Sequence, residues 1–180
     1  MIKDQQNHQR RSIRLAGYDY TQAGAYFVTI VSRNRAQLFG EILDGEMHLN
    51  DLELIVHNMW LEIPCHFLNV NVDAFVVMPN HVHGIIILND CDVGARHAVP
   101  LPNVERFGKP VPGSIPTIVR SFKSAVTNRI NLMRNTPGAS VWQRNYYERI
   151  IRDEQEHETT LDYIYSNPQN WLLDMEFTRN

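Results

Sequence analysis

The sequence predicts an α+β protein in which an antiparallel sheet carries helices on one face. Helical segments alternate with strand-like ones along the chain. Two apolar strands are separated only by Pro79-Asn80, and so short a break permits only an antiparallel connection. The chain has 180 residues, 43% of them hydrophobic and 21% charged, which suits one folded domain with a core of ordinary size. We therefore expect a single domain over residues 1–180.

The first elements are a strand and a hairpin. Residues 26–31 are rich in β-branched and aromatic side chains, which favours a strand. Residues 38–43 and 46–49 flank Asp44-Gly45, a pair typical of the type I′ turn of a hairpin. Before this strand, residues 1–20 form a basic arm.

A helix and two apolar strands follow. Asn50 or Asp51 can cap the helix, which we expect to stop before Pro64. In the next strand, residues 70, 72, 74, 76 and 78 alternate and are predicted to share one face. The strand that begins at His81 is apolar on both faces, so we expect both strands to be central and buried.

The second half starts with a long loop over residues 89–114, which holds four Pro and three Gly and has no periodicity. Ser114 can cap an amphipathic helix that ends at Pro137-Gly138. Extended segments follow between 141 and 151, and a last helix runs from about 153 to 167. This order fits a ferredoxin-like, split βαβ core with a C-terminal helix that carries a tyrosine, Tyr163.

The net charge of −3 conceals an uneven distribution. Residues 1–40 carry a balance of +4, residues 41–95 a balance of −9, residues 96–152 a balance of +8, and the remainder −6. The total by itself argues against nucleic acid as a partner. The two basic blocks could nevertheless converge in the fold and bind phosphates, or they could be ordinary solvated surface.

Several classes of protein are excluded by composition. No apolar stretch approaches the roughly 18 residues that a spanning helix needs, so we expect no membrane segment. The first 14 residues lack the apolar core of a secretory signal. Two cysteines cannot form a disulfide framework, and free thiols suit a cytoplasmic protein.

His81 and His83 flank a single residue at the start of a predicted strand. Side chains at positions i and i+2 of a strand point to the same face, so the two imidazoles lie side by side. They could hold one divalent cation, or they could be half-buried histidines bonded to the backbone. Ile85 and Ile87 continue the same face as an apolar wall, which places the pair at the mouth of the core.

Tyr163 and Asn167 are four residues apart and therefore lie on one face of the last helix. A tyrosine hydroxyl is a nucleophile once the phenolate is favoured, and an Asn oxygen could complete a His-His-Asn set for Mg²⁺ or Mn²⁺. The alternative is that Tyr163 only packs. Tyr146 and Tyr147 are competing nucleophile candidates on a strand.

Together these motifs resemble those of the HUH single-strand endonucleases, in particular the single-tyrosine transposases of the REP-associated type. The resemblance covers nearly the whole chain. It rests on Pro79-Asn80-His81-Val82-His83-Gly84-Ile85, on 142–148 with 151–154, on 162–168, and on 11–15, 17–20 and 26–29.

The resemblance implies a metal-dependent reaction on DNA. His81, His83 and Asn167 would be ligands of Mg²⁺ or Mn²⁺, and Tyr163 would attack the scissile phosphate of single-stranded, hairpin-bearing DNA. The products would be a covalent 5′-phosphotyrosine and a free 3′-OH, and the reverse reaction would rejoin the strands. Related transposases act as monomers or as homodimers, so Tyr163 could serve its own subunit or a partner.

Basic side chains in both charge blocks are candidates for contacts with DNA phosphates. They are Arg10, Arg11, Arg14, Arg120, Lys123, Arg134, Arg144, Arg149 and Arg152. Among the aromatic residues near them, Tyr18, Tyr20 and Trp142 could stack on unpaired bases. The loop 89–114 has no chemistry that we can assign.

Two other functions compete with a transposase. A non-catalytic, domesticated DNA-binding protein would recognise repeated palindromic hairpins without cleaving them. A small metal-dependent hydrolase of a non-nucleic substrate would have negligible affinity for DNA at physiological salt.

Overall fold

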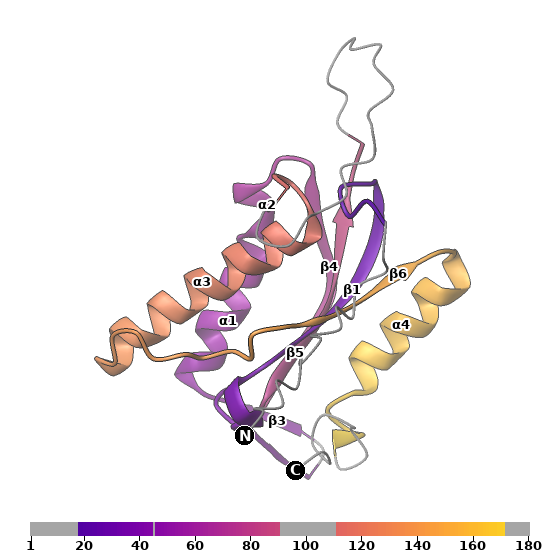
Figure 1. Ribbon diagram of the computed structural model, residues 1–180. Coiled ribbons are helices and arrows are strands. Elements are labelled where there is room, and N and C mark those ends of the chain that lie inside the picture. Colours follow the sequence, from indigo (N-terminus) through magenta and orange to yellow (C-terminus); the bar gives the residue numbers. More distant parts are fainter. Residues whose placement is uncertain (1–17, 45, 91–110, 172–180) are drawn as a thin grey trace, which may run out of the picture.

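The core of the molecule is a four-stranded antiparallel sheet in the order β4-β5-β1-β6 (Figure 1). A computed structural model describes residues 18–44, 46–90 and 111–171. With helices α1 and α3 as crossovers, this strand order is that of the ferredoxin-like fold that the sequence predicts. The strands are β1 (Gly24–Val31), β4 (Val70–Met78), β5 (His81–Leu88) and β6 (Tyr147–Ile151).

Helices cover both faces of this sheet. Helices α1 (Asp51–Leu61) and α3 (Ile115–Arg134) pack on one face, and helix α4 (Glu154–Ser166) packs on the other (Figure 1). The larger core lies under α1 and α3, around Trp60 and Phe122. A smaller cluster under α4 contains Ala74, Ile85, Ile151 and Ile164. The prediction of helices on one face therefore holds for α1 and α3, while the tyrosine-bearing helix covers the opposite face.

The smaller elements surround the central sheet. The predicted hairpin is confirmed as a separate two-stranded sheet, in which Glu41 pairs with His48 and Leu43 with Glu46. A 3₁₀ turn follows β1, and a one-turn helix follows α1. These elements are β2 (Gly40–Leu43), β3 (Glu46–Leu49), η1 (Arg33–Arg35) and α2 (Ile63–His66).

The helix starts are set by side-chain caps, as the sequence indicates. The Asn50 side chain accepts hydrogen bonds from the backbone N–H groups of Leu52 and Glu53, at 3.0 and 3.1 Å. Ser114 begins α3, and Asp153 begins α4 by accepting from the Glu156 N–H at 2.8 Å.

Helix α1 ends before Pro64, as predicted, whereas α3 ends slightly earlier than predicted. α1 stops at Leu61, and Pro64 falls inside the short helix α2, where an early helical position tolerates proline. α3 ends at Arg134, before the predicted Pro137-Gly138, because Asn135 adopts the left-handed conformation (φ 51°) that terminates a helix. None of the helices in the described part of the chain is long and apolar enough to cross a membrane.

Strand β4 departs from the predicted pattern in two ways. It is an edge strand, so only β5 of the two apolar strands is central. A register shift between Val72 and Phe75 also interrupts its alternation. Val70 and Val77 therefore contact the large core, whereas Ala74 faces the cluster under α4. The prediction of one shared face is wrong because a bulge exchanges the two faces of a strand.

Gly84 in the middle of β5 allows the large core to approach the sheet closely. A Cβ atom at this position would collide with Cζ2 of the Trp60 ring and lie 2.9 Å from Cβ of Phe75. Trp60 and Phe75 stack with ring centroids 5.7 Å apart, so a side chain at position 84 would force this stacked pair to shift. The residue after His83 thus has to be a glycine for reasons of packing.

We predict that Gly84→Ala lowers the free energy of unfolding by about 1–3 kcal/mol, the usual cost of overpacking a core. Urea unfolding measures the loss. Trp60→Phe removes the part of the indole that the new methyl group would meet, so in that background Gly84→Ala should cost clearly less. An equal cost in both backgrounds would show that Trp60 does not impose the glycine.

Candidate functional site

His81 and His83 lie at the start of strand β5, and their side chains point to the face of the sheet that α4 covers. His81 pairs with Val31 of β1, and His83 pairs with Thr29. Both imidazoles therefore lie beside the C-terminal end of β1. Their ring centroids are 4.3 Å apart, and their side chains are buried, at 0% and 2% exposure. The same-face arrangement that the spacing predicts is therefore present.

A side-chain hydrogen bond orients Nδ1 of each imidazole. Nδ1 of His81 lies 2.7 Å from Oδ1 of Asn80, and Nδ1 of His83 lies 2.8 Å from Oγ1 of Thr29. An amide oxygen can only accept, so Nδ1 of His81 carries the proton. This leaves the lone pair of His81 on Nε2, the atom that a metal would use.

Burial keeps both rings neutral. It lowers the pKa of His83 to about 3. Burial also lowers the pKa of His81 well below the usual 6.5. Repulsion from the charge that a protonated His83 would carry, and from the Arg35 guanidinium, adds to that shift. Neutral imidazoles are the form of histidine that coordinates metals.

Tyr163 reaches His83 from helix α4. Its hydroxyl oxygen lies 3.1 Å from Nε2 of His83. Because a phenol is a better donor than acceptor, we assign the hydrogen to Tyr163 and the His83 proton to Nδ1, which then donates to Thr29. Phe27 lies against both rings, with centroids 5.3 Å from His83 and 5.9 Å from Tyr163. Tyr163 is 44% exposed, so its hydroxyl meets both the imidazole and solvent.

Asn167 caps the end of α4, four residues after Tyr163. Its side chain is 3% exposed, and within the described residues its Oδ1 has no hydrogen-bond partner. A buried amide oxygen without a partner is unfavourable by about 1–3 kcal/mol, so a ligand that engages it would be stabilising.

The donor set at this site fits a divalent cation. Two neutral imidazoles and a buried amide oxygen could hold it through Nε2 of His81, Nε2 of His83 and Oδ1 of Asn167. Binding at His83 would replace the hydrogen bond that Nε2 accepts from Tyr163. The described part of the chain contains no group of three or more His, Cys, Asp and Glu side chains that could hold a metal by themselves. A metal held by the two imidazoles would need a further ligand, for which the Asn167 oxygen is a candidate.

Helix α4 is fixed to the sheet on both sides of the tyrosine. Nε2 of His157 lies 2.8 Å from a carboxylate oxygen of Asp73 in β4, and Arg149 of β6 donates to Thr160 at 2.8 Å. After the helix, the Trp171 ring stacks on His81 at 6.1 Å between centroids. The position of Tyr163 is thus determined by contacts with both edge strands.

A groove of about 320 Å³ opens beside Tyr163. Tyr163 and Phe27 line it together with Tyr147, Glu148 and Arg149 of β6. Tyr147 is exposed and pairs with Thr29 in the sheet, two strands away from His83, or roughly 10 Å at the usual strand spacing. Tyr146 packs against the large core instead. Of the three candidate nucleophiles, Tyr163 is the best placed at the histidine pair, because its hydroxyl is hydrogen-bonded to His83.

The basic side chains that the sequence singles out are not gathered at this site. Arg149 lines the groove beside Tyr163. Arg144 precedes β6 and is exposed, and Arg152 forms an ion pair with Glu156 at 3.4 Å. Arg120, Lys123 and Arg134 belong to α3, on the other face of the sheet. Arg10, Arg11 and Arg14 lie outside the described residues, as do residues 91–110 of the predicted loop.

Lys123 binds backbone carbonyl groups of this protein, a role that the sequence does not reveal. Its ammonium donates to the backbone carbonyls of Gln143, Arg144 and Asn145, at 2.6, 3.2 and 3.3 Å. Burial lowers its pKa to about 8. Two proposed base-stacking residues are likewise used elsewhere, since Tyr20 and Trp142 are 6% and 5% exposed in the large core.

Sequence reasoning missed the residues that orient the histidines. Asn80 is next to His81 in the chain, so adjacency could have suggested it. Thr29 and Phe27 are far from the histidines in sequence, and only the pairing of β1 with β5 brings them to His83.

Comparison with known proteins agrees with this fold. No family model matches the chain. An uncharacterized protein of Haemophilus influenzae is 43% identical over 173 residues, which cover 93% of this chain and 92% of the relative. A "Putative REP-associated tyrosine transposase" of the same organism is 27% identical over 152 residues, or 83% of this chain and 73% of that protein.

The fold also matches a solved structure, that of a REP-associated tyrosine transposase bound to a REP hairpin. The TM-score is 0.56, with 23% sequence identity over 83% of this chain and 68% of the other. The chain therefore has the fold of a tyrosine transposase, the class that its sequence motifs indicate. It belongs to the same family as the uncharacterized Haemophilus protein, and its sequence is also similar to that of the putative REP-associated tyrosine transposase.

We predict that both imidazoles stay in the neutral Nδ1–H form at pH 5, where an ordinary histidine is protonated. Imidazole ¹⁵N chemical shifts measure the form, with the urea-unfolded chain as the reference. The unfolded state binds more protons between pH 6.5 and about 3, so acid should destabilise the fold through this window. A charged imidazolium signal from His83 in the folded protein at pH 5 would contradict the arrangement.

Proposed function

We propose that the chain is a transposase that nicks and rejoins single-stranded, hairpin-bearing DNA, with Tyr163 as nucleophile and a divalent cation held by His81, His83 and Asn167. One observation carries the proposal: the Tyr163 hydroxyl lies 3.1 Å from a nitrogen that would bind the metal. The proposed nucleophile, Tyr163, is thus in contact with His83, one of the proposed metal ligands, at one end of the sheet. The hairpin bound by the related solved structure supports the choice of substrate.

The residues of this chain would divide the work as follows. A bound Mg²⁺ or Mn²⁺ would supply charge stabilisation at the scissile phosphate. Asn80 and Thr29 hold the imidazoles with their Nε2 atoms directed into the site. Phe27 and the buried face of α4 exclude water from one side of the tyrosine.

The covalent step exchanges one ester bond for another. The Tyr163 oxygen forms a bond to phosphorus while the bond from phosphorus to the 3′ oxygen breaks. The phenol loses its proton, and the departing oxygen gains one, so a 5′-phosphotyrosine and a free 3′-OH result. Because the bond energy is kept in the new ester, attack by a 3′-OH can reverse the step and rejoin a strand.

The groove beside Tyr163 supplies a path for the strand. Arg149 is exposed there, with its guanidinium carbon 5.9 Å from the centre of the Phe27 ring. It can meet a phosphate, while the exposed Tyr147 ring can stack on a base. Tyr163 also contacts His83 of its own chain, which supports catalysis within one subunit.

We predict that Tyr163→Phe abolishes a covalent protein–DNA adduct with hairpin-bearing single-stranded oligonucleotides and Mn²⁺. Denaturing gels of labelled DNA measure the adduct. Tyr147→Phe, in the same groove, and Tyr165→Phe, 67% exposed on the same helix, are the matched controls and should retain it.

An adduct that persists in Tyr163→Phe and disappears in Tyr147→Phe would show that the nucleophile is on β6. Tight hairpin binding without any adduct, unchanged by His81→Ala, would identify the chain as a non-catalytic DNA-binding protein. Negligible DNA affinity at physiological salt would favour a hydrolase of another substrate.

We predict that Asn167→Ala lowers Mn²⁺ affinity about tenfold or more, the effect of losing even a supporting residue of a metal site. Titration calorimetry measures the binding without DNA. Asn167→Asp restores an oxygen ligand and should bind at least as tightly as the wild type. The exposed Asn170→Ala is the control. Equal affinity of Asn167→Ala and Asn170→Ala would remove Asn167 from the ligand set.

A further inference from the structure

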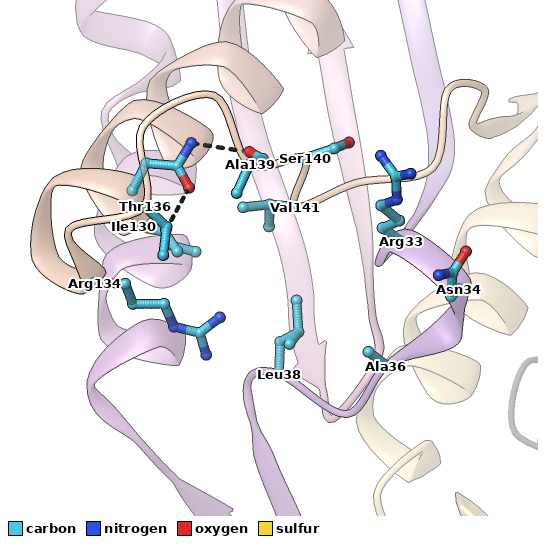
Figure 2. Close-up of a pocket in the computed structure, with 11 residues that line it drawn as sticks. Arg33, Asn34, Ala36, Leu38, Ile130, Arg134, Thr136, Ala139, Ser140 and Val141 are labelled. Carbon is cyan, nitrogen blue, oxygen red and sulfur yellow. Dashed lines mark hydrogen bonds between the residues drawn. The ribbon is translucent and has the colours of Figure 1, made fainter.

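A second pocket, of about 190 Å³, lies at the C-terminal end of α3, away from the tyrosine groove (Figure 2). Three segments form it: the turn after β1, the end of α3, and the loop that leads to β6. Its apolar floor is formed by Ala36, Leu38 and Ala139, together with Ile130 and Val141, which belong to the large core and are almost completely buried. This volume is below the roughly 300 Å³ of a pocket for a drug-sized ligand, so it suits one small ring system.

The rim of this pocket is basic. Arg134 reaches in from α3 and Arg33 lies across from it, on the other side of Leu38 (Figure 2). Of the described residues that line the pocket, none is acidic. Two guanidinium groups around an apolar floor favour a ligand that joins a flat apolar ring to an anion.

The walls of the pocket are fixed by hydrogen bonds. The Asn131 side chain donates to the Ala139 carbonyl at 2.9 Å and accepts from the Thr136 hydroxyl at 3.3 Å (Figure 2). On the opposite wall, the Arg33 N–H donates to the Val141 carbonyl at 2.7 Å. The turn also holds Asn34 in the left-handed conformation at φ 55°, a strained state that the surrounding structure has to maintain.

The pocket and the histidine pair lie at the same end of the sheet. Val31 pairs with His81, and the next residue, Ser32, donates its N–H to the Asn80 carbonyl at 2.8 Å. The turn at residues 33–36 continues directly from there. Arg33 of this turn lines the pocket. A strand that crosses this short turn would connect the two sites.

We propose that this pocket binds one unpaired nucleotide of the DNA substrate, with its base on the apolar floor and its phosphate between Arg33 and Arg134. The proposal rests on the proposed function only in taking DNA as the substrate. It adds Arg33, which the sequence does not single out, and it gives Arg134 a specific position. It also assigns a use to the face of the sheet that is opposite the tyrosine.

Binding without metal tests this pocket. Fluorescence anisotropy would compare a hairpin carrying unpaired flanks with the same hairpin lacking them. Arg33→Ala and Arg134→Ala should each weaken binding of the flanked hairpin about tenfold and reduce the salt slope by about 0.7, the value for one single-strand phosphate. Arg129→Ala removes an exposed arginine of α3 outside the pocket and should leave the flank preference unchanged.

A steric variant separates the base from the phosphate. Ala139→Phe fills the pocket without changing charge, and it should lower affinity for the flanked hairpin about tenfold, as expected for one lost base contact. A scan of single abasic positions along the flank should find one that weakens the wild type to the same degree. That position should have no further effect in Ala139→Phe, because both changes remove the same contact.

Several results would overturn the proposal. Equal loss on flanked and unflanked hairpins, additive effects of the abasic site and Ala139→Phe, or variants indistinguishable from Arg129→Ala would each do so. Circular dichroism and urea unfolding check that every variant is folded. These experiments measure binding and not cleavage, so they can be interpreted even if Tyr163 forms no adduct. The proposed nucleotide pocket and the proposed transposase activity can therefore fail separately.

Discussion

The candidate site depends on a continuous line of hydrogen bonds from Thr29 through His83 to Tyr163. Two buried imidazoles are costly unless their polar atoms are satisfied, and burial keeps them uncharged. One strand supplies the partner for Nδ1 of His83, and one helix supplies the partner for Nε2. The line therefore holds β1, β5 and α4 in a single relative position, and any change in strand register would break it.

The two faces of the sheet differ in how much apolar side chain they bury. The large core under α1 and α3 contains the bulkiest buried side chains, and Gly84 lets Trp60 pack directly on the sheet. The opposite face carries a much smaller apolar cluster, and the buried histidine pair lies beside it, with Phe27 of that cluster against His83. Consecutive residues of β5 serve both purposes, because His83 points to one face and Gly84 lies against the other.

The charge distribution acquires its meaning only in three dimensions. A net charge of −3 hides two basic blocks, yet their members have different uses in the fold. Arg149 lines the tyrosine groove, Lys123 stabilises three carbonyls before β6, and Arg134 lies at a pocket on the other side. Basic residues that are neighbours in sequence are therefore distributed over both faces of the sheet.

The sequence by itself determined the order of elements, the shared face of His81 and His83, and the spacing of Tyr163 and Asn167. These features depend on local periodicity, which is 2 in a strand and 3.6 in a helix. Only the tertiary structure decided that Thr29 meets His83, that α4 covers the histidine face, and that β4 is a bulged edge strand. Those outcomes depend on strand register and on which layers pack together, and contacts between residues far apart in the chain set both.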